Sequence, residues 1–233
     1  MRRTLIAEGV GTFVLVFAGT SAIVLNVRTG DLGDLGVALV FGLAVAAMVQ
    51  SFVRVSGAHL NPAVTFGMWL AGGMAGRRAL AYTVAQLTGA VSASLLVRAV
   101  FGMTAHLGAT LPRTDVVPAL LFEAIATLIL VEVVLTAADN GASPAEAALL
   151  IGAALFLDAL IAGPMSGASM NPARSFGPAL VGGIWRGQWV YWVGPAIGAV
   201  CAVGLRSLVG AHTTVLRVRR AGRPLPRPGG QAP

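Results

Sequence analysis

The sequence contains no lysine, a single cysteine and few charged residues. Only 11% of its 233 residues are charged, whereas 56% are apolar. Soluble domains carry roughly a quarter charged residues, because a folded domain needs a polar surface. This shortage of charge excludes an ordinary soluble enzyme, and the excess of apolar residues excludes a disordered chain. The composition predicts a polytopic membrane protein.

Two further absences narrow the function. The lone Cys201 cannot form an internal disulfide and provides no cysteine framework for a metal, so we expect no metal site. The apolar segments hold no HExxH motif and no serine–histidine–aspartate set. Glu123 and Glu132 have no histidine beside them with which to share acid–base work. We therefore expect no enzymatic activity.

The basic residues are all arginine, and 16 of them against nine acids give a net charge of +7. Five of these arginines lie in the last 17 residues. A basic cluster that follows a membrane span is typical of a cytoplasmic anchor beside anionic lipid, rather than of a nucleic-acid interface. We therefore predict that residues 211–233 form a basic, disordered cytoplasmic tail and that the protein binds no nucleic acid.

Six segments are apolar and long enough to cross a membrane, since a helix needs ~20 apolar residues to cross a bilayer core of about 30 Å. Positive residues mark the cytoplasmic side, and Arg2, Arg54 and Arg77 lie before the first span or between the second and third. Both termini are therefore predicted to be cytoplasmic, in a multi-pass protein of the cell (inner or plasma) membrane. The predicted spans are residues 5–27, 35–53, 79–97, 116–138, 147–164 and 187–205.

Two other apolar segments, residues 59–71 and 169–181, are too short to cross, and each contains Asn-Pro near its start. They belong to an internal repeat, because residues 56–67 and 166–177 are identical at eight of twelve positions. Irregular backbone at membrane depth survives only where protein buries it or water lines it. Short hydrophobic segments at matching positions in two halves therefore indicate a solute path.

The repeat predicts the fold class. Three spans, an odd number, separate the two short segments, so these segments must enter the membrane from opposite faces. We expect an all-α integral membrane protein with six transmembrane helices and two re-entrant half-helices in an inverted three-plus-three repeat. The first repeat is predicted over residues 1–108, with its half-helix at 61–71, and the second over residues 109–210, with its half-helix at 171–181.

Each short segment carries the triplet Asn-Pro-Ala. Proline fits the first position of a helix, with asparagine as the N-cap before it. The positive ends of two half-helices would then meet near the midplane, repel cations and protons, and offer amide donors to a neutral hydroxyl solute. A pair of buried N-caps in a bundle without a pore is the simpler alternative. The candidate pore residues are Asn61, Pro62, Ala63, Asn171, Pro172 and Ala173, preceded by extended residues with pore-lining carbonyls at Gly57, Ala58, His59, Gly167, Ala168 and Ser169.

The strings AEGVGTF, SGAHLNPAVTFG and SGASMNPARSFGPA resemble the aquaporin (major intrinsic protein) family, over about residues 4–209. The resemblance implies one pore per subunit, a homotetramer in the lipid bilayer, and passive flow of water or small neutral solutes without a cofactor. It also implies that Glu8 and Glu123 hold the N–H groups of the two re-entrant loops. By the family pattern, the selectivity filter is formed by Phe41, Ala159, Ala168 and Arg174.

This filter holds one aromatic residue and two alanines. By the family pattern, water-selective members usually carry histidine in place of Ala159, and glycerol facilitators tend to carry aspartate in place of Ser175. The sequence around Ser175 looks closer to the nodulin-like proteins of plants and their bacterial relatives, which pass glycerol, urea and metalloid hydroxides. We therefore predict a channel for water and small neutral solutes (glycerol, urea, metalloid hydroxides) that excludes ions and protons. A water-selective aquaporin is the alternative.

Other interpretations stay open at this point. A gradient-coupled secondary transporter also uses inverted repeats, and a junction protein would use the same fold with a closed pore. The sequence leaves open whether Asp158, next to Ala159, contacts a helix, a subunit or the vestibule, and it gives Glu132 no partner. His59 fits either a packed core residue or a pH sensor.

Overall fold

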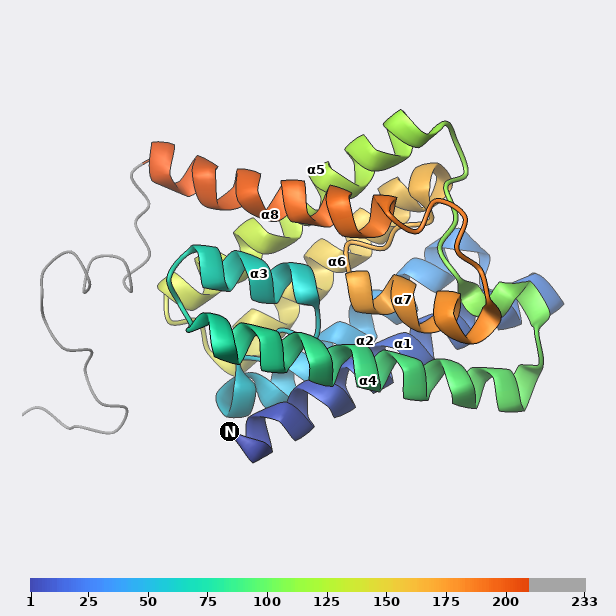
Figure 1. Cartoon of the computed structure of the whole chain (residues 1–233), viewed down its shortest axis with the longest axis horizontal. Coiled ribbons are helices and arrows are strands. Elements are labelled where there is room, and N and C mark those ends of the chain that lie inside the picture. Colours follow the sequence, from blue (N-terminus) through green and yellow to red (C-terminus); the bar gives the residue numbers. More distant parts are fainter. Residues whose placement is uncertain (210–233) are drawn as a thin grey trace, which may run out of the picture.

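The computed structural model describes residues 1–209, so the predicted basic tail lies outside the described residues. Within this part of the chain there are eight α-helices, one short helical turn and no strand. Figure 1 shows their arrangement. The elements are α1 (Arg2–Thr29), α2 (Gly33–Ser56), α3 (Pro62–Leu70), α4 (Gly76–Phe101), η1 (Thr104–Gly108), α5 (Val116–Asp139), α6 (Pro144–Ser166), α7 (Pro172–Gly182) and α8 (Val190–Leu208).

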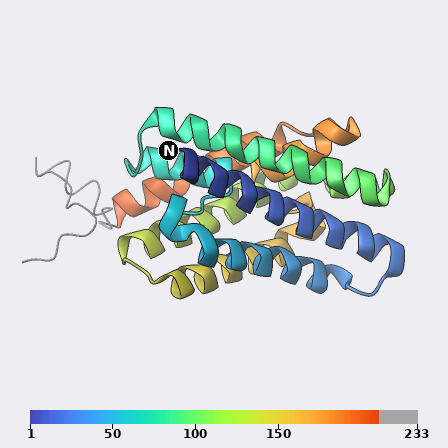
Figure 2. The same cartoon turned by 90° about the horizontal axis from the view of Figure 1, so that it is seen from below.

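Six helices of the described chain are long and apolar enough to cross a membrane, namely α1, α2, α4, α5, α6 and α8. They run roughly side by side along one direction (Figures 1 and 2). The remaining two, α3 and α7, follow the second and fifth of these spans. The predicted six spans and two half-helices are therefore confirmed.

The two halves of the chain repeat one packing pattern. In the first half α1 packs against α4 and α2, and in the second half α5 packs against α8 and α6. The halves meet where α2 packs against α6. In Figure 1 the turns α3–α4 and α5–α6 lie at the end of the molecule that holds the N-terminus, and α1–α2, α4–α5 and α7–α8 connect at the other end. The half-helices thus enter from opposite ends, which is the expected inverted repeat.

Backbone contact at equivalent places brings the helices of each half together. A Cβ atom at Gly89 of α4 would lie 2.2 Å from the carbonyl oxygen of Gly9 on α1. A Cβ atom at Gly198 of α8 would lie 2.3 Å from the carbonyl oxygen of Ala124 on α5. Small residues allow such close crossings in membranes, where packing rather than water drives helix association.

A partly buried ion-pair network joins α8 to α5 at the end of the bundle that holds the N-terminus. Arg206 donates to Glu132 at 2.7 Å and to Thr136 at 2.8 Å, and it also pairs with Asp139. The sequence alone did not indicate a partner for Glu132. The structure shows that its partner is Arg206, 74 residues further along the chain.

Candidate functional site

Both half-helices begin at an asparagine N-cap. Asn61 has extended backbone angles, and its Oδ1 accepts a hydrogen bond from the Ala63 N–H at 2.8 Å. Asn171 is also extended, and its Oδ1 accepts from the N–H groups of Ala173 at 3.0 Å and Arg174 at 3.2 Å. Proline follows each asparagine at the start of the helix. The predicted N-caps are confirmed.

The two asparagines also join the half-helices to each other. Asn61 Nδ2 donates to the carbonyl oxygen of Met170 at 2.7 Å, and Asn171 Nδ2 donates to the carbonyl oxygen of Leu60 at 2.9 Å. In Figure 1, α3 and α7 lie end to end between α4 and α8. Because a side-chain amide carries two N–H donors, each asparagine keeps one donor beyond this reciprocal pair. The positive ends of two helix dipoles therefore face each other inside the bundle.

A buried glutamate of α1 holds the first re-entrant loop. Glu8 is fully buried. Its carboxylate accepts hydrogen bonds from the N–H groups of His59 at 3.0 Å and Leu60 at 2.7 Å. It also accepts from Ser56 Oγ at 2.6 Å and Gln86 Nε2 at 2.8 Å. Four donors thus satisfy a carboxylate that would otherwise be costly at this depth.

Glu123 of α5 does the same for the second loop. This side chain is also fully buried, and it accepts from the N–H groups of Ser169 at 2.8 Å and Met170 at 2.7 Å. Ser166 Oγ donates a third hydrogen bond at 2.6 Å. Tyr191 then donates to the carbonyl oxygen of Ser166 at 2.6 Å. The repeat therefore extends from backbone to individual hydrogen bonds.

The expectation that the residues before each triplet are extended is wrong for Gly57, Ala58, Gly167 and Ala168, whose φ angles are positive. Residues with left-handed backbone angles occur in both loops, and four of these residues are not glycine. Such angles are unfavourable for residues with a Cβ, but here they accompany two successive N–H groups that bind one glutamate carboxylate. The positive φ angles are those of Gly57 (92°), Ala58 (48°) and Leu60 (53°), and of Gly167 (85°), Ala168 (46°) and Met170 (51°).

Three small cavities follow one another through the bundle. The first, about 50 Å³, shares Phe41, Ala159 and Ala168 with the second, which is about 10 Å³. The second shares Leu15, Leu155 and Asn171 with the third, about 30 Å³, which Asn61 and His59 also line. The cavities therefore mark a narrow passage from one end of the bundle past both asparagines.

The four residues expected to form a filter all line the 10 Å³ cavity, where α2, α6, α7 and the second loop meet. The guanidinium carbon of Arg174 lies 5.0 Å from the ring centroid of Phe41, within the range of a cation–π contact. Arg174 is 1% exposed, and its Nη1 donates to the carbonyl oxygen of Gly108 at 2.8 Å. Its Nε has no hydrogen-bond partner within the described chain. One fixed cation with a free donor therefore faces one aromatic ring and two methyl groups.

The sequence did not predict the residues that support this filter from distant parts of the chain. Gly108 lies in the connection between the halves, and Thr110 of the same connection donates to Ser175 Oγ at 2.6 Å. Ser175 in turn shares a hydrogen bond of 2.5 Å with Ser169. No local motif indicates these contacts. The bonds of Gly108 and Thr110 join residues far apart in the sequence, and the bond between Ser169 and Ser175 joins hydroxyl groups of a kind common in loops. Ser175, at which the sequence departs from the pattern of glycerol facilitators, thus contacts the connection between the two halves.

Two residues that the sequence left open have defined places. His59 is half-buried, with its Nδ1 3.1 Å from Thr65 Oγ1 and its ring against the edge of Tyr82. Asp158 is 2% exposed, and its Oδ2 has no hydrogen-bond partner within residues 1–209. Asp158 therefore lies inside the bundle and not on a surface that a second subunit would cover. Over the same residues, no group of His, Cys, Asp and Glu could hold a metal ion.

Six apolar spans, two half-helices joined at their tips and a narrow passage beside the joint define a polytopic membrane protein of the inverted-repeat channel class. The chain matches the family description "Major intrinsic protein" over residues 1–205. The protein therefore belongs to the major intrinsic protein family, the family of aquaporin channels. This membership confirms the resemblance carried by the triplets. Channels of this family are not enzymes.

Named relatives agree with this assignment. Aquaporin NIP1-1 of Zea mays is 46% identical over 208 residues, which cover 88% of this chain and 74% of the relative. Nodulin-26 of Glycine max is 38% identical over 208 residues, which cover 88% of this chain and 77% of the relative. The X-ray structure of the aquaglyceroporin from Plasmodium falciparum matches with a TM-score of 0.81 and 27% identity, covering 89% of this chain and 96% of that one. The expected fold class is confirmed.

Proposed function

We propose that this protein is a passive channel for water and small neutral solutes, including glycerol, urea and metalloid hydroxides, and that it excludes ions and protons. The observation that supports the proposal is the row of cavities that passes between Phe41 and Arg174 and then along Asn61 and Asn171. Every solute on this path meets fixed hydrogen-bond donors and an apolar wall. Fixed donors in a narrow pore favour neutral hydroxyl solutes.

The filter roles follow from the chemistry of the four lining residues. Arg174 is a planar cation that can donate to a solute oxygen, and Phe41 supplies an apolar wall. Ala159 and Ala168 leave room where a larger side chain would close the path. Cations and protons are repelled by Arg174 and by the two helix ends that meet at Asn61 and Asn171. The carbonyl groups of residues 57–59 and 167–169 complete the path as acceptors.

The remaining parts of the proposal concern the setting of the pore. We assign one pore to each subunit of a homotetramer in the cell (inner or plasma) membrane, with both termini in the cytoplasm. Arg2, Arg54 and Arg77 support this orientation, since arginines concentrate on the cytoplasmic side. Glu8 and Glu123 serve as supports of the loops. The repeats are residues 1–108 and 109–210, and no cofactor takes part.

A water-selective channel is the second candidate, and the filter favours it because the cavity there is the smallest of the three along the path. Stopped-flow light scattering on proteoliposomes with the purified protein separates the two candidates. We expect water, glycerol and urea all to cross faster than in protein-free vesicles, with fluxes that do not change when a proton or sodium gradient is imposed. Water flux alone would select the second candidate, and gradient-dependent flux would contradict both.

A further inference from the structure

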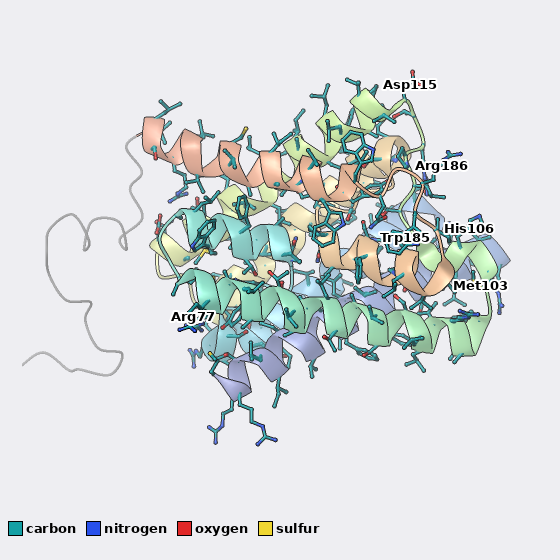
Figure 3. All side chains as sticks on the ribbon, viewed as in Figure 1. Arg77, Met103, His106, Asp115, Trp185 and Arg186 are labelled. Atoms are coloured by element: carbon teal, nitrogen blue, oxygen red, sulfur yellow. The ribbon has the colours of Figure 1, made fainter. Side chains whose placement is uncertain are left out.

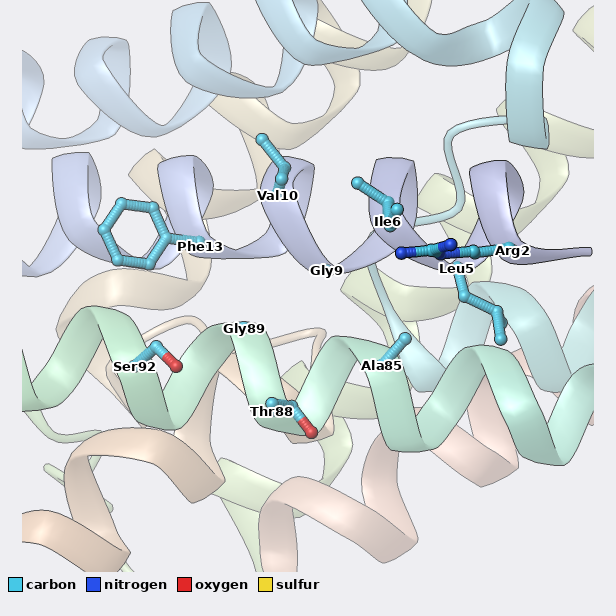
Figure 4. Close-up of a pocket in the computed structure, with 10 residues that line it drawn as sticks. All are labelled: Arg2, Leu5, Ile6, Gly9, Val10, Phe13, Ala85, Thr88, Gly89 and Ser92. Atoms are coloured by element: carbon cyan, nitrogen blue, oxygen red, sulfur yellow. The ribbon is translucent and has the colours of Figure 1, made fainter.

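A groove of about 640 Å³ runs along the outside of the bundle between α1 and α4, away from the passage just described. Figure 4 shows the groove and the residues that line it. Its floor is the crossing of α1 and α4 at Gly9 and Gly89, where a Cβ atom at Gly89 would lie 2.2 Å from the carbonyl oxygen of Gly9. The Thr88 hydroxyl already donates to the carbonyl oxygen of Val84 at 2.9 Å, so it needs no polar ligand. The walls are Leu5, Ile6, Val10 and Phe13 of α1 with Thr88 and Ser92 of α4.

The groove is as long as one leaflet is deep. Arg2 and Phe13 mark its two ends on α1. At 1.5 Å per residue this stretch of helix is about 16 Å long, which is half of the ~30 Å hydrocarbon core. Gly11, near the inner end, abuts Leu60, the residue before the first triplet: a Cβ atom at Gly11 would lie 2.4 Å from Leu60 Cδ2. The groove therefore runs from the membrane surface to the level at which the half-helices meet.

The outer end of the groove is cationic. Arg2 is exposed and lies beside Leu5 and Ile6 in Figure 4. No acid neutralises it within residues 1–209, because both ion pairs found there are made by Arg206. The groove is apolar, is one leaflet deep and ends at the unpaired cation of Arg2. It therefore complements an amphiphile with an anionic headgroup. In a bilayer this description fits an anionic phospholipid.

We propose that the groove between α1 and α4 binds one acyl chain of an anionic phospholipid, with the lipid phosphate at Arg2. The chain fills the hollow above Gly9 and Gly89, and the headgroup charge selects the lipid. An arginine at an anionic membrane surface contributes about 1 kcal/mol, equivalent to about a five-fold change in affinity. The proposal is independent of which solute crosses the channel.

Native mass spectrometry of the delipidated full-length protein tests the headgroup. The added lipids are phosphatidylglycerol and phosphatidylcholine with identical acyl chains. We expect about five-fold tighter binding of phosphatidylglycerol to one site per subunit, and Arg2→Gln should abolish this preference. Arg77→Gln is the matched control, because Arg77 is exposed at the same end of the molecule but does not line the groove (Figure 3). Equal binding of the two lipids, or equal loss in both variants, would overturn the proposal.

A second variant tests the groove itself. Thr88→Phe fills the groove and should remove one bound lipid of either headgroup, whereas Leu95→Phe, at an exposed position of α4 outside the groove, should retain it. Undiminished lipid binding by Thr88→Phe would overturn the proposal. A second pair of results would also overturn the proposal: the unmodified protein binds no lipid, and Thr88→Phe dissociates the oligomer. These results would show that a second copy of the chain covers the groove.

Discussion

Phe41 occupies the space that a side chain at residue 19 would need: a Cβ atom at Gly19 would lie 2.0 Å from Cε1 of the Phe41 ring. Helix α1 thus leaves room for a ring that belongs to α2, and the ring lies 5.0 Å from the guanidinium carbon of Arg174. The width of the candidate filter therefore depends on a glycine that does not line it.

We predict that Gly19→Ala narrows the filter. The added methyl group pushes the Phe41 ring toward the 10 Å³ cavity, because overpacking shifts the neighbouring side chain. Glycerol flux in proteoliposomes should fall several-fold, and water flux should fall less. Gly204→Ala is the control, since a Cβ atom there meets no atom within 4 Å. Unchanged glycerol flux in Gly19→Ala would show that this contact does not set the width.

Replacing Ala159 by histidine should restrict the channel to water. The imidazole adds a donor and fills part of the cavity that Ala159, Phe41 and Arg174 line. Stopped-flow measurements should show that Ala159→His slows glycerol far more than water. Equal slowing of both solutes would contradict the assignment of Ala159 to the filter.

Removal of either loop carboxylate should cost stability. Glu8→Gln and Glu123→Gln each replace an oxygen acceptor by an N–H₂ donor that faces other donors, so buried N–H groups lose their partner. Each charge-assisted hydrogen bond lost is worth about 1.5–3 kcal/mol. We expect both variants to melt at lower temperature in detergent, with the larger decrease for Glu8→Gln because Glu8 accepts four hydrogen bonds and Glu123 three. Unchanged melting would show that the loops hold without the carboxylates.

The network around Arg206 makes a separate prediction about the end of the bundle that holds the N-terminus. Arg206→Met leaves Glu132 and Asp139 without their cation, and breaking a buried pair is costlier than replacing it entirely. The arginine is mostly buried, but Glu132 is 30% exposed, which limits the loss to about 1–3 kcal/mol. The triple variant Arg206→Met, Glu132→Gln and Asp139→Asn should recover part of the melting temperature. A triple variant less stable than Arg206→Met would contradict this account.

The sequence predicted those features of the fold whose signals are local. Each span is a continuous apolar run, and Asn61 with Pro62 forms an N-cap signature that needs no tertiary contact. The matching positions of the second triplet, at Asn171, gave the inversion by counting spans. The class and family followed from these features.

Local sequence patterns did not predict the contacts between distant segments. Arg206 pairs with Glu132 across 74 residues, and nothing near either residue points to the other. The left-handed angles of Ala58 and Ala168 conflict with residue preference, and they persist in loops whose N–H groups bind Glu8 and Glu123. Such positions, where tertiary contacts override local preference, are concentrated at the candidate site.

If solutes cross through the cavity beside Ala159, a side chain that fills this cavity must stop their flux. Ala159→Trp should abolish the flux of water and glycerol in proteoliposomes while the protein keeps its helical content and oligomeric state. Leu149→Trp, on the outer face of the same helix with 71% of its surface exposed, should leave both fluxes unchanged. Undiminished flux through correctly folded Ala159→Trp would contradict the account, because solutes would then cross by another path.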